Sequence, residues 1–177
     1  VFDTLRLIRQ RCKRGFVVGI RISPERFGMD MADQLEVTRM LVNSGLVDFI
    51  DFSLWDCFKE PETPAFAGKT LIEHFMAIPR GKVRYTVAGK IFSAATAARC
   101  LEAGADFVAL GRAAILHHDF PQKVAADPDF TMVETPVTPA YLANEGLSPG
   151  FVKYMRRWKG FVTEPEAVEA AATAEAK

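Results

Sequence analysis

Residues 83–112, VRYTVAGKIFSAATAARCLEAGADFVALGR, contain two short apolar runs that flank a helix-like segment. The runs VRYTVAG (83–89) and DFVALG (106–111) are rich in β-branched and aromatic residues, which is typical of buried strands. Between them, SAATAARCLEAG places Ser93 where a helix N-cap belongs and Gly104 where the helix should close. A strand, a helix and a second strand in this order indicate βα units of a parallel sheet.

Two further apolar runs of the same kind precede this stretch, FVVGIRI (16–22) and VDFIDFS (47–53). The four runs begin about 23 to 36 residues apart, as expected of consecutive βα units. Between them, helices are predicted over residues 31–45, with Gly45 as the C-cap, and over residues 68–81. The fold class is therefore α/β with a parallel sheet. A doubly wound sheet and a (β/α)8 (TIM) barrel both show this alternation, so the choice between them rests on motifs.

The composition excludes several classes of protein. The chain has 177 residues, of which 49% are hydrophobic and 25% charged, a balance typical of a folded globular domain. Its 22 basic and 22 acidic residues cancel, so neither nucleic acid nor a membrane is predicted as a partner. No apolar run is long enough to span a bilayer. Three cysteines without a CxxC pair suggest neither a disulfide framework nor a metal site, and they fit a cytoplasmic location.

Glycines follow the last two predicted strands, in VAGKI (87–91) and ALGR (109–112). Glycine at the carboxyl end of a strand lets the backbone approach a phosphate oxygen, and the last two loops of a (β/α)8 barrel commonly bind phosphate. The N–H groups of Gly89, Lys90, Gly111 and Arg112 would then point at the phosphate, and the Arg112 guanidinium would add a charge-assisted contact. The alternative is that both glycines form tight turns and that Arg112 is a surface residue.

Arg21 interrupts the apolar strand VVGIRIS, although arginine is almost never buried without a partner. Its side chain is predicted to point into the barrel near the carboxyl-terminal rim, where ligands bind. A cation there would stabilise negative charge on a bound aromatic ring system. The alternative is an internal salt bridge with Asp51 or Asp48.

Together, VGIRISPERFG, LVDFIDFS, VAGKI, EAGADFVALGRAAIL and NEGLSPGFVKYMRRWKGFV resemble the old yellow enzyme family of NAD(P)H:flavin oxidoreductases. The resemblance extends over the chain up to about residue 163. It implies strands five to eight of an FMN-binding barrel, and an ene-reductase activity in which FMN and NAD(P)H reduce an activated alkene. It assigns Arg21 to the polar end of the flavin ring, and it assigns Gly89, Lys90, Gly111 and Arg112 to the FMN phosphate.

In the family, a catalytic His-His or His-Asn pair and a tyrosine proton donor lie in the first half of the barrel, so no catalytic residue is predicted in this chain. The three histidines are interpreted as structural or solvated, and no metal ligand is predicted. Trp55, in the loop after the second strand, is expected to line the opening for a small-molecule substrate; a packed surface loop is the alternative. An α-hydroxy-acid oxidase, a phosphate-binding isomerase and a non-catalytic half-barrel remain as alternative functions.

The implied organisation is a half-barrel over residues 1–130, a loop and helix extension over 131–163, and a disordered tail over 164–177. The chain begins at Val1 inside a predicted helix, as expected of a fragment. In the extension, the segment 151–158 combines arginines with large aromatic residues, which are enriched at interfaces, so a homo-oligomer through this segment is expected. The alternative is that this helix packs on its own barrel.

Overall fold

The computed structural model of the chain describes residues 1–163 and divides into two compact units, Val1–Gly111 and the part from Arg112 onward. The first unit is an α/β structure, as the sequence predicts. The expected boundary at residue 130 lies inside the second unit, and the prediction for residues 164–177 falls outside the described residues.

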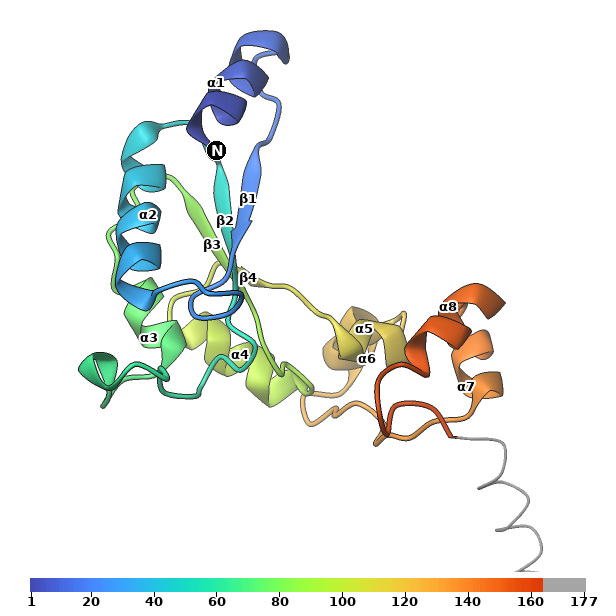
Figure 1. Cartoon of the computed structure of the whole chain (residues 1–177). Coiled ribbons are helices and arrows are strands. Elements are labelled where there is room, and N and C mark those ends of the chain that lie inside the picture. Colours follow the sequence, from blue (N-terminus) through green and yellow to red (C-terminus); the bar gives the residue numbers. More distant parts are fainter. Residues whose placement is uncertain (164–177) are drawn as a thin grey trace, which may run out of the picture. The chain divides into compact units, whose positions relative to one another are not determined.

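The four expected strands are present and form one parallel sheet with the order β1-β2-β3-β4 (Figure 1). They are shorter than the apolar runs that predict them: β1 is Gly19–Ile22, β2 Phe49–Ser53, β3 Arg84–Ala88 and β4 Phe107–Val108. The two common doubly wound orders contain no more than three consecutive strands in sequence order. A sheet with four consecutive strands in sequence order is compatible with the wall of a barrel.

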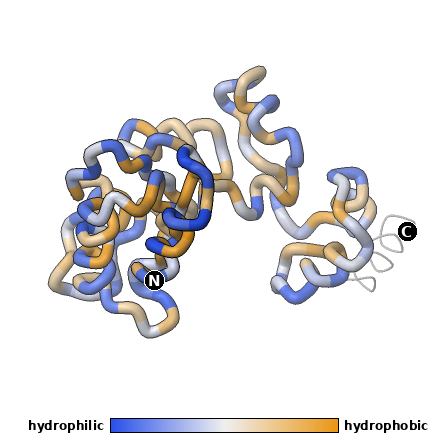
Figure 2. Tube along the Cα trace, turned by 90° about the horizontal axis from the view of Figure 1, so that it is seen from above, coloured by the Kyte–Doolittle hydropathy of each residue, from blue (hydrophilic) through white to orange (hydrophobic). Residues whose placement is uncertain are grey.

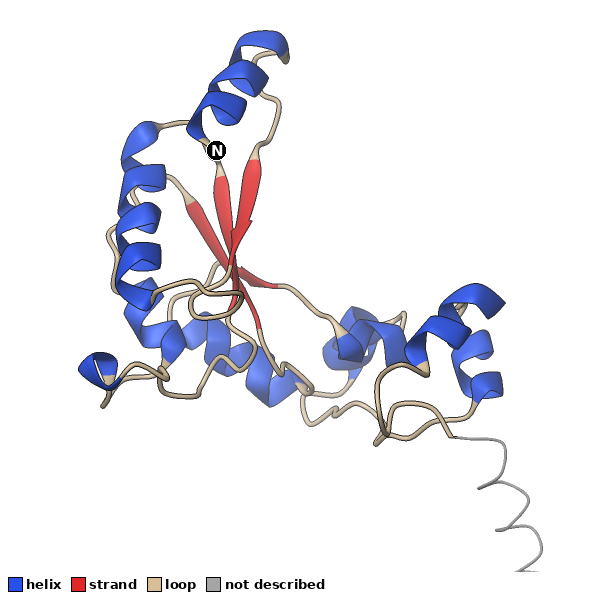
Figure 3. Cartoon of the chain, in the orientation of Figure 1, coloured by secondary structure: helices blue, strands red, loops and turns tan. Residues whose placement is uncertain are grey.

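Helices precede and connect these strands (Figure 3). They are α1 (Phe2–Arg11), α2 (Met31–Ser44), the short 3-10 helix η1 (Pro64–Phe66), α3 (Leu71–Met76) and α4 (Ala94–Glu102). The expected caps are confirmed, since Gly45 closes α2 in the left-handed conformation and the Ser93 hydroxyl accepts from the Thr96 N–H. Hydrophobic and hydrophilic residues are interspersed along the chain (Figure 2), and α2, α3 and α4 each bury some residues and leave others exposed.

The two faces of the sheet differ in what covers them. On one face Ile50, Phe52, Tyr85 and Val87 are fully buried in a cluster with side chains of α2, α3 and α4. Side chains alternate along a strand, so the register places Gly19, Arg21, Phe49, Asp51, Thr86 and Phe107 on the other face, hereafter the open face. Arg21 and Phe107 are exposed there. Helices on a single face are expected of a barrel wall, whereas a doubly wound sheet has them on both.

Two aspartates at the amino-terminal ends of strands tie neighbouring elements together in the same way. Asp48 Oδ2 accepts from the Val18 N–H at 2.7 Å and from Arg9 at 2.8 Å. Asp106 Oδ2 accepts from the Tyr85 N–H at 2.8 Å and lies 2.9 Å from Arg80, while its Oδ1 lies 2.7 Å from Arg84. These carboxylates fix the end of the sheet that lies opposite the candidate site.

The second unit is helical, with α5 (Arg112–Leu116), α6 (Phe120–Ala126), α7 (Pro139–Asn144) and α8 (Pro149–Met155). The helix α7 was not expected, because its stretch is rich in proline and glycine. Pro139 is nevertheless tolerated in the first helical turn, and the Thr138 hydroxyl caps the helix by accepting from the Tyr141 N–H. Among the described residues, no helix is both long and apolar enough to cross a bilayer.

Candidate functional site

The predicted site residues of the first unit share the carboxyl-terminal edge of the sheet. Arg21 lies near the end of β1, Gly89 and Lys90 follow β3 directly, and Gly111 comes after β4. The strand β2 separates Arg21 from Gly89. Arg112 follows Gly111 in the chain and begins the second unit.

Two polar side chains of β2 contact the guanidinium of Arg21 at its Nε atom. Its Nε donates to Ser53 Oγ and lies 3.3 Å from Asp51 Oδ2. The sequence left open a salt bridge of Arg21 with Asp51 or Asp48. Arg21 forms this salt bridge with Asp51, whereas Asp48 pairs with Arg9. The side chain of Arg21 is nevertheless 63% exposed. Its two terminal nitrogens donate no hydrogen bond within residues 1–163, so they retain donors for a ligand.

The structure gives Gly89 a packing role that the sequence did not predict, while its contact with a phosphate stays a prediction. A Cβ at this position would lie 2.9 Å from the Asp56 nitrogen and 3.0 Å from the Cys57 nitrogen, because the loop after β2 passes directly against it. Lys90 adopts a positive φ of 49°, and its ammonium lies 2.9 Å from Asp56 Oδ2. The backbone N–H groups of Gly89 and Lys90 donate to no backbone carbonyl in the described part of the chain.

Gly111 contrasts with Gly89. It does not have a positive φ, and a Cβ added there would meet no atom within 4 Å. Neither backbone conformation nor packing among the described residues thus explains a glycine at this position. The predicted role of Gly111 at a phosphate therefore stays a prediction.

Trp55, the predicted substrate-lining residue, is 54% exposed and follows β2 at the same edge. The Arg26 guanidinium lies 4.8 Å from the centre of its ring, a cation–π contact. Phe27, next to Arg26, is 85% exposed. The sequence reasoning missed Arg26 and Phe27, although SPERFG directly follows the strand of Arg21 and was the available signal.

Glu25 joins this β1–α2 loop to the loop after β2. Its Oε1 accepts from the Glu62 N–H at 2.7 Å, and its Oε2 lies 3.4 Å from Lys59 Nζ. The two loops that carry Phe27 and Trp55 are therefore connected to each other. The edge combines two exposed aromatic rings with Arg26, which suits an aromatic or anionic small molecule.

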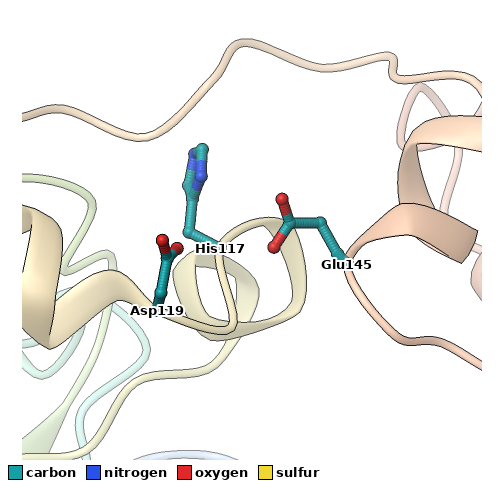
Figure 4. A group of neighbouring side chains, drawn as sticks. All are labelled: His117, Asp119 and Glu145. Atoms are coloured by element: carbon teal, nitrogen blue, oxygen red, sulfur yellow. The ribbon is translucent and has the colours of Figure 1, made fainter.

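One group of potential metal ligands occurs among the described residues, formed by His117, Asp119 and Glu145 of the second unit (Figure 4). Its members already have partners. His117 Nε2 accepts from the Val133 N–H at 2.9 Å, so its lone pair is used and the ring proton is on Nδ1, facing Tyr141. Asp119 pairs with Lys123, and Glu145 accepts from the backbone and ring of His118. Burial lowers the pKa of His117, which fits a neutral structural side chain.

Comparison with known protein families finds no family model that matches the chain. A curated protein that is similar is the NADH:fumarate oxidoreductase of Klebsiella pneumoniae (strain 342), with 27% identity over 135 residues. The alignment covers 73% of this chain but only 14% of that protein. The chain therefore spans about one seventh of the length of this relative.

Proposed function

We propose that this chain is the FMN-binding portion of an NAD(P)H-dependent flavin oxidoreductase, formed by strands five to eight of a (β/α)8 barrel. The observation that carries the proposal is the geometry of Arg21. Its guanidinium is held through Nε at the carboxyl-terminal edge of a parallel sheet, and its two terminal nitrogens donate no hydrogen bond in the described part of the chain. Ligands of barrel enzymes bind at this edge. A fixed cation there suits the electron-rich, polar end of a flavin ring.

The residues at the last two strands fit a phosphate group. Gly89 and Lys90 offer backbone N–H groups without backbone partners, and Gly111 leaves open space beside the chain. We assign Arg112, the next residue, to the phosphate as its main side-chain contact, because an arginine makes charge-assisted and often bidentate bonds to phosphate. The Lys90 ammonium is engaged by Asp56, so the contribution of Lys90 is assigned to its backbone.

The relative supports the class of reaction. Its name states that it transfers electrons between NADH and fumarate. Fumarate is an alkene activated by carboxylates, and its reduction adds a hydride to one carbon and a proton to the other. We propose the same class of substrate, an activated alkene, for the complete protein to which this chain belongs.

FMN, when bound, would supply hydride transfer between NAD(P)H and the alkene, and the alkene would also need one proton. The residues of this chain would bind and orient it. Arg21 would stabilise negative charge on the ring, while Trp55, with Phe27 beside it, would line the opening for the substrate. The proton donor is not assigned to any described residue.

The test is anaerobic turnover by the complete protein with NADH or NADPH and an activated alkene such as cyclohexenone or fumarate. We expect oxidation of the nicotinamide to match formation of the saturated product. If the protein is saturated with FMN and oxidises neither NADH nor NADPH in the presence of any activated alkene, the proposed reaction is contradicted.

A further inference from the structure

Asp51 is a carboxylate that the fold only partly satisfies. Its side chain is 15% exposed on the open face, and its Oδ2 lies 3.3 Å from Arg21 Nε. Its Oδ1 is buried and has no hydrogen-bond partner among the described residues. The neighbour in register on β3, Thr86, has a hydroxyl that is likewise buried without a partner. Arg21, Asp51 and Thr86 thus form a polar row across three strands.

The structural carboxylates of the same sheet are different. Asp48 and Asp106 each accept a backbone N–H and pair with arginine, and both have lowered pKa values. Burial raises the pKa of Asp51, and the charge of Arg21 only partly opposes this. The ionised form of Asp51 is therefore less stable in the fold than in water, whereas the other two stabilise the fold. A carboxylate kept at such a cost indicates a role outside folding.

The position of Asp51 suggests that role. Together with Ser53 it contacts Nε, the edge of the guanidinium nearest the Arg21 backbone. These contacts at Nε restrict rotation of the side chain, while the two terminal nitrogens donate no hydrogen bond to a described residue. A carboxylate at this distance also reduces the positive potential that the guanidinium presents to a ligand.

We propose that Asp51 is a positioning residue that fixes Arg21 and offsets part of its charge, and thereby sets the midpoint potential of a bound flavin. This inference rests on the proposed function. It predicts that Asp51 and Arg21 act on the potential in opposite directions, because one is negative and the other positive. Ser53 contributes to the position of the guanidinium without contributing charge.

The experiment measures the midpoint potential of FMN bound to the complete protein and to its variants Asp51→Asn, Arg21→Ala and Ser53→Ala, at mildly alkaline pH where carboxylates are ionised. Asp51→Asn keeps an oxygen that can accept from Nε, so Arg21 stays in place and only a negative charge is lost. We expect its potential to rise, whereas Arg21→Ala lowers it. Asp3→Asn on α1, the helix that precedes β1, removes a carboxylate that is 94% exposed and should leave the potential unchanged.

The outcomes separate this inference from the function on which it rests. If the unmodified complete protein binds no FMN, the proposed function fails and the inference fails with it. If FMN binds and Asp51→Asn leaves the potential unchanged or lowers it, the inference is wrong while the proposed function stands. A second measurement tests whether the variant is misfolded. The denaturant concentration that unfolds Asp51→Asn should be no lower than the concentration that unfolds the unmodified protein, as expected when an unfavourable buried charge is removed.

Discussion

The backbone nitrogen of Asp56 lies 2.9 Å from the place where a side chain at Gly89 would begin. The loop after β2 therefore packs on the loop after β3, and it does so through backbone atoms that have little freedom to shift. The same two loops are joined by the ion pair of Asp56 with Lys90. The shape of the loop after β3, which is proposed to bind the phosphate, is thus set partly by the loop after β2.

Alanine at Gly89 should destabilise the protein, by about 1–3 kcal/mol, because the new methyl group meets backbone atoms. Gly111→Ala is the matched comparison, since its methyl group meets nothing within 4 Å. We expect Gly111→Ala to keep the free energy of unfolding but to weaken FMN binding. Chemical denaturation and FMN titration of both variants check this. Equal loss of stability in the two variants would contradict the packing argument.

Arg21→Ala should lower the midpoint potential of bound FMN more than it weakens FMN binding. Loss of a cation disfavours the more negative, reduced form of the ring, while the phosphate contacts that retain the cofactor remain. Potentiometry and FMN titration of the complete protein measure the two effects. An unchanged potential would favour a purely structural salt bridge with Asp51.

Arg112→Ala should weaken FMN binding by about 1.5–3 kcal/mol, the scale of a charge-assisted contact. Arg39→Ala is the control, because Arg39 is an exposed arginine on α2 whose ion-pair partner within residues 1–163 is Glu36. Fluorescence titration of FMN distinguishes the two variants. Equal affinity in Arg112→Ala and the control would remove Arg112 from the proposed site.

Asp106 makes stability depend on pH. Burial alone would raise its pKa, but the Tyr85 N–H, Arg84 and Arg80 together lower it. Because the folded pKa lies below the unfolded one, the stabilisation is present at neutral pH and is lost as pH falls through the folded value. Asp106→Asn should therefore be less stable than the unmodified protein at neutral pH, and the difference should shrink below about pH 4.

Denaturation at several pH values measures this difference. Asp3→Asn is the control, because the Asp3 side chain is 94% exposed and its variant should show little change at any pH. A difference for Asp106→Asn that stayed constant from neutral to acidic pH would show that its charge is not responsible.

The sequence predicted the strands and most helices because their signals are local. Apolar runs marked the strands, and Ser93 and Gly45 marked helix ends, since caps depend on neighbouring backbone groups. The second role of Gly89 was not predictable, because it depends on a loop more than thirty residues earlier in the chain. The partner of Arg21 was left open between Asp51 and Asp48, and only the register of β1 with β2 decided it. Phe27 was missed because a single exposed aromatic residue in a loop has no periodic pattern.

The segment 151–158 presents Phe151, Tyr154 and Trp158, each 40–48% exposed, and stacks Phe151 on Tyr154 with ring centres 5.7 Å apart. Exposed aromatic residues next to arginines are typical of an interface. We propose that this segment bridges subunits. Deletion of residues 151–177 from the complete protein should then give a smaller oligomer and lower turnover. Unchanged mass by light scattering together with unchanged turnover would contradict the bridging role.

FMN binding by the complete protein tests most directly whether residues of this chain hold a flavin phosphate. The complete protein, purified without added flavin and then titrated with FMN, should show flavin absorbance and bind FMN at one site per chain, with riboflavin binding far more weakly because it lacks the phosphate. A complete, folded protein that binds neither compound, or that binds riboflavin as tightly as FMN, would contradict the assignment of Gly89, Lys90, Gly111 and Arg112 to a flavin phosphate.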